Sequence, residues 1–284
     1  MSNNGRGTVI VTGSSTGIGA SCARYLADRG FRVFAGVRKE GDAANIRAYG
    51  NARLQPLTID ITKHETIVDA LKVVTTSFGS DGLTALVNNA GVSYDQPIEC
   101  VPLDSLRHQF EVNVIGTVAM TQACVPLLRQ SRGRIVTVGS INGRVATAWS
   151  GPYCMSKFAL EAFSDCLRQE LKPWGINVSL IEPGAIKTAL WNKGLGFDWS
   201  ATASPKSLEL YGDSFKRFRR FLEKSAATAV APDKVNEAVL HAITATTPHT
   251  RYLVGSDAKA FAFIASLLPD RMLDRLIQKT LFGA

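Results

Sequence analysis

The sequence has few of the residues that build disulfide frameworks or zinc sites. Its five cysteines are scattered without a Cys-x-x-Cys pair, and only four histidines are present. Both kinds of site need closely spaced ligands, so we expect no disulfide framework, no metal centre and reduced thiols. No low-complexity tract or internal repeat occurs, which excludes disordered, collagen-like and coiled-coil proteins.

Long hydrophobic runs are also scarce. The first residues, MSNNGRG, are polar and lead into an apolar strand without the apolar segment of a secretory signal. The longest apolar stretch, Ala258–Leu268, contains Lys259 and is too short to cross a bilayer. We therefore predict a soluble, cytoplasmic protein. Its net charge of +8 suits an anionic cofactor or membrane surface, and no motif indicates a nucleic-acid partner.

Hydrophobic residues make up 45% of the 284 positions, enough for a large core. Short apolar runs alternate with helix-period segments, as in a parallel sheet buried on both faces. Strands are predicted at Thr8–Thr12, Arg32–Val37, Leu54–Ile59, Ala85–Val87, Arg134–Gly139, Asn177–Ile181 and Arg251–Val254. Helices are predicted at Ile18–Arg29, Glu65–Phe78, Leu103–Arg129 and Lys157–Leu171. The pattern indicates a single α/β domain over 1–284, a Rossmann-type doubly wound parallel sheet of about seven strands.

Two segments interrupt this alternation or follow it. The stretch 184–212 reads as irregular, and we assign a substrate loop and lid to about 184–228. A C-terminal extension covers about 256–284. The basic segment 214–224 reads as an amphipathic helix, either a lid over the substrate or a surface that contacts anionic membrane. We favour the lid, because one such helix binds membrane weakly without a second anchor.

A glycine-rich turn follows the first predicted strand, with the order Gly-x-x-x-Gly-x-Gly over residues 13–19. Glycines there let backbone N–H groups and a helix N-terminus approach a pyrophosphate. The second strand ends at Arg38-Lys39, where NAD sites carry an acid. The two cations favour the 2′-phosphate of NADP(H), although they could instead be a solvated surface pair that leaves NAD(H) as cofactor. No basic residue lies within the glycine turn to support the phosphate.

Four residues form a candidate catalytic set. Tyr153 and Lys157 are four apart on a predicted helix and share a face. A free tyrosine has a pKa of about 10, and a neighbouring ammonium group lowers it, so Tyr153 is a candidate general acid and base. Ser140 ends a strand and could hold a substrate oxygen or cap a helix. Asn113, within a helix, could hold an ordered water or cap a helix irregularity.

Together these residues resemble the short-chain dehydrogenase/reductase family in its single-domain branch. The matching motifs, in chain order, are Thr12–Gly19, Asp60, Asn88-Asn89-Ala90-Gly91, Asn113, Ser140, Tyr153-x-x-x-Lys157 and Pro183-Gly184-x-x-x-Thr188. The resemblance implies that Tyr153 exchanges the proton, Ser140 orients the carbonyl, Lys157 binds the nicotinamide ribose and Asn113 anchors a water. The cofactor contacts predicted from turn and resemblance are Gly13, Ser15, Thr16, Gly17, Ile18, Gly19, Arg38, Lys39, Asp60, Ile61, Asn88, Ala90, Gly91, Tyr153, Lys157, Pro183, Gly184, Ile186 and Thr188.

The segments 180–188 and 251–255 are similar to the retinol and 17β-hydroxysteroid dehydrogenase-like group, which implies an alcohol or ketone of steroid, retinoid or acyl-chain type. The apolar residues Leu190, Trp191, Leu195, Phe197 and Trp199 are predicted to line the pocket, or else to pack the lid on the body. Alternatives are a small-substrate 3-ketoacyl or hydroxybutyrate-type reductase and an NADP(H)-sensing regulator without turnover. The family implies a homodimer or homotetramer through helices at 103–130 and 153–172.

Overall fold

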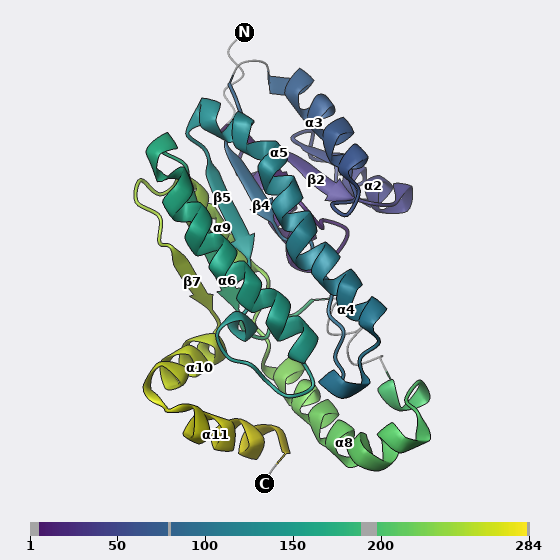
Figure 1. Ribbon diagram of the computed structural model, residues 1–284. Coiled ribbons are helices and arrows are strands. Elements are labelled where there is room, and N and C mark those ends of the chain that lie inside the picture. The colour runs from purple at the N-terminus through teal and green to yellow at the C-terminus, as the bar shows by residue number, and fades with distance from the viewer. Residues whose placement is uncertain (1–5, 79–80, 189–197, 283–284) are drawn as a thin grey trace.

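The computed structural model describes residues 6–78, 81–188 and 198–282 (Figure 1). Seven parallel strands form one sheet in the order β3-β2-β1-β4-β5-β6-β7. Their bounds are β1 Thr8–Val11, β2 Arg32–Val37, β3 Leu54–Thr58, β4 Ala85–Asn88, β5 Arg134–Val138, β6 Asn177–Pro183 and β7 Arg251–Val254. The order reverses between β1 and β4, where open α/β sheets bind ligands. The predicted Rossmann-type sheet is confirmed.

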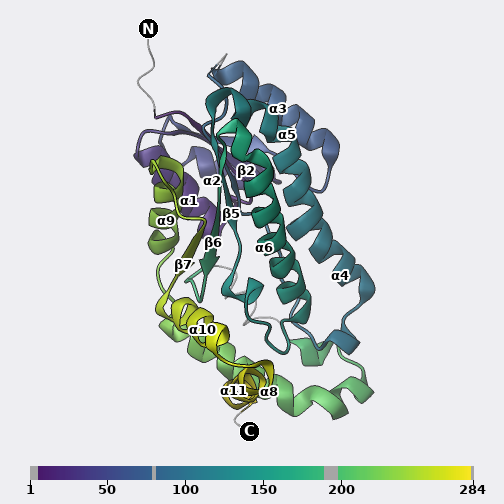
Figure 2. The ribbon, with the colours of Figure 1, turned by 60° about the vertical axis from the view of Figure 1, so that its left-hand side comes forward.

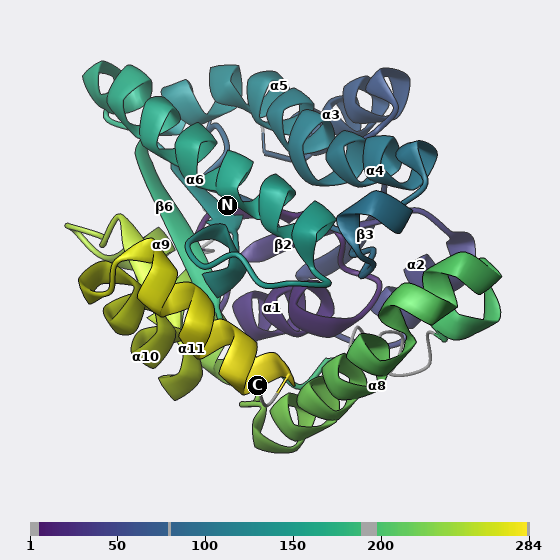
Figure 3. The same ribbon diagram turned by 60° about the horizontal axis from the view of Figure 1, so that its bottom comes forward.

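Helices cover both faces of the sheet (Figure 3). One face carries α1 Gly17–Asp28, α2 Glu40–Arg47 and α9 Asp233–Thr244, and the other carries α3 His64–Phe78, α4 Leu103–Phe110, α5 Gly116–Ser131 and α6 Gly151–Leu171. Each face has its own apolar core, to which the strands contribute alternate residues. Val9 and Val33, for example, face the α1 side, whereas Ile10 and Phe34 face the α3 side. Both positions in each strand are therefore apolar, as the continuous runs indicated.

A third apolar cluster lies beyond the carboxyl edge of the sheet (Figure 2). It is formed by α8 Pro205–Thr228, α10 Ser256–Leu267 and α11 Asp270–Phe282 around Trp149, a buried residue in the left-handed region at φ 71°. Prediction and structure differ here, because residues 205–212 were assigned to an irregular stretch and belong to α8. The Ser204 side chain caps this helix by accepting from Ser207 N at 3.1 Å.

The segment Leu103–Ser131, predicted as one helix, is interrupted by a π-helical turn, η2 Glu111–Ile115. The interruption occurs where the Asn113 side chain bonds the backbone of Val92, so the helix widens to admit it. By length and composition this is the one stretch of the described residues that could cross a membrane. In the structure its Met120, Cys124 and Leu128 pack in the core on the α3 face of the sheet.

Candidate active site

The segments that follow four of the strands lie at one edge of the sheet, because the carboxyl ends of parallel strands are at the same edge. The glycine turn follows β1, residues 89–91 follow β4, Ser140 follows β5 and residues 184–188 follow β6. Helix α6 begins at the same edge and carries Tyr153 and Lys157 in its first two turns. The predicted site residues of these segments therefore come together in space.

The glycine turn is held by the segment after β4. Asn89 Nδ2 donates to the carbonyl oxygens of Thr12 and Gly13 at 2.9 and 3.1 Å. Thr12 Oγ1 accepts from the backbone N–H groups of Asn89 and Ala90 at 3.0 and 3.1 Å. Gly13 has φ +67°, and a Cβ there would lie 2.7 Å from Ala90 Cα, so only glycine fits. Thr12 and Asn89 were quoted as motif residues, but the sequence analysis gave them no role.

The start of α1 suits an anion. Thr16, its N-cap, makes no side-chain capping bond, and the first turn contains no acidic residue. Gly17 has φ +61°, and a Cβ there would meet only the Thr188 side chain, at 3.3 Å. Backbone N–H groups at this helix end are thus left for an external partner, and the turn is narrow where it meets Thr188. These features fit the pyrophosphate of a dinucleotide.

Arg38 and Lys39 follow β2 and are exposed. Asp60 follows β3, and its Oδ1 accepts from Thr62 N at 3.1 Å and from Thr62 Oγ1 at 2.8 Å. Partial burial opposes the charged form of Asp60, but the Thr62 hydrogen bonds and the nearby Arg38 charge outweigh it and lower the pKa of Asp60. Arg38 and Asp60 are therefore neighbours at the rim of the site.

Tyr153 lies between Ser140 and Lys157. Its hydroxyl is hydrogen-bonded to Ser140, and Lys157 Nζ lies 5.5 Å from its ring centroid and donates to Val138 O at 2.9 Å. Burial raises the pKa of Tyr153 to about 12, although the Ser140 bond lowers it, and burial lowers the pKa of Lys157 to about 8. The expected lowering of the tyrosine pKa by Lys157 is not found in the structure. Burial removes water from the phenolate, and this effect on the pKa of Tyr153 is the largest.

The side chain of Asn113 is occupied by the protein itself. Its Oδ1 accepts from Val92 N at 2.8 Å, and its Nδ2 donates to Val92 O at 2.9 Å and to Ser156 Oγ at 3.0 Å. Of the two interpretations offered for this residue, the structure matches the cap of a helix irregularity. Asn88 donates to Thr121 Oγ1 at 2.8 Å, and its buried Oδ1 has no hydrogen-bond partner within the described part of the chain.

Two aspartates that sequence reasoning missed contact these segments. Asp95 accepts from Ser93 Oγ at 3.2 Å and from Ser150, and its negative charge contributes to the raised pKa of Tyr153. Asp257, on α10, accepts from Ala185 N at 2.7 Å and lies where a Cβ on Gly184 would be. The contacts of Asp95 with Ser150 and Tyr153, and that of Asp257 with Ala185, join residues far apart in the sequence, so no pattern indicated them.

Four of the five predicted lining residues, Leu190, Trp191, Leu195 and Phe197, lie outside the described residues. Trp199 is described, and it is buried in the third apolar cluster. Its ring meets Trp149 edge-on, with ring centroids 5.0 Å apart. Trp199 therefore packs the lid on the body, as the alternative interpretation held.

The chain is similar in sequence and in fold to known proteins. The short chain dehydrogenase family matches residues 7–195. Retinol dehydrogenase 16 of Mus musculus is 38% identical, with 96% of this chain and 88% of that protein covered. 17-beta-hydroxysteroid dehydrogenase type 6 of Homo sapiens is 36% identical, again with 96% of this chain and 88% of that protein covered.

Solved structures agree with the sequence comparison. A short-chain dehydrogenase from Streptomyces avermitilis superimposes with a TM-score of 0.79 at 27% identity, covering 98% of this chain and 97% of its own. A short chain dehydrogenase from Burkholderia cenocepacia J2315, solved in complex with NADP, gives 0.73 at 27% identity and covers 99% of both chains. The chain therefore belongs to the short-chain dehydrogenase family of oxidoreductases.

Proposed function

We propose that the protein interconverts an alcohol and a ketone or aldehyde on a hydrophobic steroid, retinoid or acyl-chain substrate, with NADP(H) preferred over NAD(H). The observation that carries the proposal is Tyr153 in contact with both Ser140 and Lys157 at the edge that holds the glycine turn. The names of the relatives, retinol and 17β-hydroxysteroid dehydrogenases, support the substrate class. The NADP bound to the Burkholderia relative supports the cofactor.

The bound nicotinamide supplies or accepts the hydride. In oxidation Tyr153 takes the hydroxyl proton as the substrate carbon loses its hydride, and in reduction it returns a proton to the carbonyl oxygen. Ser140 Oγ, bonded to the Tyr153 hydroxyl, orients the same substrate oxygen. Lys157 is one helical turn further on and binds the nicotinamide ribose. Asn113 contributes a water contact only through its remaining acceptor capacity, since its amide is bonded to Val92 and Ser156.

Coenzyme-dependent turnover tests the function. Nicotinamide absorbance is followed with NADPH and NADH in parallel, against steroid, retinoid and short-chain carbonyl substrates. Turnover with NADPH on bulky apolar carbonyls is the expected result. Turnover on short ketones alone would favour the small-substrate reductase. Coenzyme binding with no turnover on the whole panel would favour the NADP(H)-sensing regulator.

Arg38→Asp tests the coenzyme preference. Loss of a charge-assisted contact to the 2′-phosphate is expected to lower the NADPH-to-NADH ratio of kcat/KM about tenfold to a hundredfold. Lys72→Asp makes the same charge change on α3, where Lys72 pairs with Asp69 at the surface, and is the control. An unchanged ratio in the Arg38 variant would make that residue part of a solvated surface.

Asp95→Asn tests the electrostatics around the proton donor. Removing this negative charge lowers the pKa of Tyr153, so the pH dependence of kcat/KM for alcohol oxidation is expected to move to lower pH. Asp104→Asn removes an equal charge from an exposed pair with Arg107 and should leave the profile in place. A profile that moves equally in both variants would reflect net charge alone.

We also propose a homo-oligomeric assembly, a lid over the substrate and a cytoplasmic location. Assembly as a homodimer or homotetramer through α4, α5 and α6 is supported by exposed apolar side chains: Leu103 of α4, Ile115 of the π turn η2 that leads into α5, and Met155 and Phe158 of α6. The lid interpretation of 214–224 is supported by Phe215 and Phe218, which are buried against Trp149. We retain the cytoplasm as the proposed location and the whole chain as one domain.

A further inference from the structure

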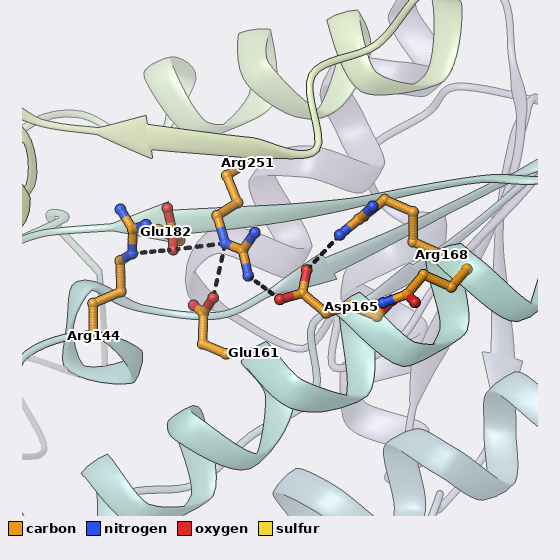
Figure 4. Close-up of polar contacts among 7 residues, drawn as sticks. Arg144, Glu161, Asp165, Arg168, Glu182 and Arg251 are labelled. Atoms are coloured by element: carbon orange, nitrogen blue, oxygen red, sulfur yellow. Dashed lines mark hydrogen bonds and ion pairs between the residues drawn. The ribbon is translucent and has the colours of Figure 1, made fainter.

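A cluster of charged side chains joins α6, β6 and β7 (Figure 4). At its centre is Glu182 of β6, which is completely buried. Its Oε1 lies 3.3 Å from Arg144 Nε and 3.7 Å from Arg251 Nε. Arg251, on β7, also donates to Glu161 Oε2 at 3.0 Å and to Asp165 Oδ2 at 2.7 Å. Two guanidinium groups therefore face a set of three carboxyl groups.

Three segments near Glu182 contribute charged groups. Arg144 comes from the segment after the short helix η3 Ile141–Gly143, Glu161 from α6 and Arg251 from β7. Asp165 of α6 lies on the other side of Arg251, where Arg168 also donates to it at 2.9 Å. Arg251 is shared with Glu161 and Asp165, and Arg144 is partly exposed to solvent, so the two guanidinium groups neutralise the charge of Glu182 only in part.

Three carboxyl oxygens of the cluster, which belong to Glu182 and Glu161, lack hydrogen bonds among the described residues. Within the part of the chain that the structure describes, neither oxygen of Glu182 has a hydrogen-bond partner, and Glu161 Oε1 is also buried without one. Buried carboxylate oxygens are rarely left unsatisfied, and a protonated carboxyl becomes a donor. A single proton between Glu182 and Glu161 would give a partner to both. Burial and the negative charge of Glu161 also raise the pKa of Glu182 to about 8, against the two arginines.

The pair connects three segments of the proposed site. Glu161 is one helical turn beyond Lys157 on α6. Glu182 immediately precedes Pro183 and Gly184, and Arg144 closes the turn that begins at Ser140. Gly143 also lies against α6, since a Cβ there would be 2.9 Å from Lys157 O and 3.0 Å from Glu161 Oε1. Movement of either carboxyl group would therefore displace the turn that contains Ser140 and the segment after β6.

We propose that Glu182 and Glu161 share one proton and act as positioning residues, which hold the turn after Ser140 and the segment after β6 against the catalytic helix. The role in positioning rests on the proposed function, whereas the shared proton does not. When the proton leaves at alkaline pH, the buried carboxylate of Glu182 and the partly buried carboxylate of Glu161 repel each other and the three segments separate. Alignment of the site then depends on a group that touches neither substrate nor cofactor.

Glu182→Gln tests the shared proton through stability. The native carboxyl binds its proton more tightly than the unfolded chain does, so wild-type stability falls as pH rises from 4.5 to about 8. The neutral glutamine lacks this dependence. The difference in Tm, variant minus wild type, is therefore expected to increase by about 3 °C or more over that range. Glu170→Gln, at an exposed position of α6, should give a constant difference.

Kinetics then test positioning. At about pH 6.5 Glu182→Gln should keep turnover within about threefold of wild type, and above about pH 8 it should exceed wild type, whereas Glu182→Ala loses turnover at both. Gln and Ala variants that fall equally at low pH would overturn the positioning role. A Tm difference that does not change with pH would overturn the shared proton.

Carboxyl carbon NMR of the wild-type protein covers the case of a variant that fails to fold. One glutamate side chain is expected to titrate near pH 8, and titration of every glutamate below about pH 6 would overturn the proposal. The Tm and NMR measurements need no substrate. If these measurements show the shared proton but the protein has no turnover, the missing turnover counts against the proposed function and the shared proton is still supported.

Discussion

Tyr153→Phe is expected to reduce turnover about a thousandfold or more and to leave coenzyme binding nearly unchanged. Only the hydroxyl that exchanges the proton is removed. The ring still packs beside Lys157, whose Nζ keeps its bond to Val138 O, and Ser140 still accepts from Asn142 N at 3.1 Å. The measurements are kcat with NADPH and the coenzyme Kd from nicotinamide fluorescence.

Tyr25→Phe is the matched control. Tyr25 lies on α1 with the Arg29 guanidinium over its ring, 3.3 Å from the centroid, and a phenylalanine keeps that contact. Its turnover should equal that of wild type. Retention of more than about a tenth of turnover in the Tyr153 variant would mean that another group moves the proton. Loss of coenzyme binding there would mean that Tyr153 is needed to shape the site.

Gly19→Ala is expected to raise the coenzyme Kd about a hundredfold, the equivalent of about 3 kcal/mol. A Cβ at Gly19 would lie 2.3 Å from Gly13 O and 2.3 Å from Asn89 Nδ2. Neither atom can move freely, because one belongs to the backbone of the turn and the other is bonded to that turn. The turn must therefore open, and the N–H groups that face the pyrophosphate lose their alignment. Isothermal titration with NADPH measures the change.

Gly212→Ala controls for the general effect of adding a methyl group to a helix. Gly212 lies within α8, and a Cβ there would meet nothing within 4 Å. Alanine has the higher helix propensity, so Tm should rise slightly while the coenzyme Kd stays the same. A Gly19 variant that binds NADPH as wild type does would show that the turn adapts and that its close packing is not required.

The sheet was predicted almost strand for strand, because burial on both faces leaves continuous β-branched and apolar runs. The run Thr8–Thr12, for example, corresponds to β1 Thr8–Val11. The errors occur where structure depends on distant partners. The π turn at Asn113 depends on Val92, which is 21 residues away. The start of α8 has a polar, glycine-containing sequence, and Tyr211 within it is hydrogen-bonded to Glu99, which is 112 residues away.

The candidate site shows the same division. Residue types and spacing indicated Tyr153, Lys157 and Ser140, since side chains one helical turn apart and strand ends at one edge must lie close together. The direction of the tyrosine pKa was wrong, because burial is a property of the folded chain. Asp257 was missed for a similar reason: it reaches Ala185 across 72 residues of sequence. Sequence patterns thus locate the chemistry better than the environment that tunes it.

Trp149 has a consequence for how such proteins can diverge. It lies between Ser140 and Tyr153 in the chain, within the part that the family shares. Its aromatic contacts and the hydrogen bond of its indole lie beyond that part: it stacks on Phe218 with ring centroids 5.6 Å apart, meets Trp199, and donates from Nε1 to Ser214 Oγ at 2.6 Å. A chimaera that exchanges residues 198–282 between relatives must therefore match position 149 as well. New substrate specificity acquired by such an exchange would therefore require a compatible change at position 149.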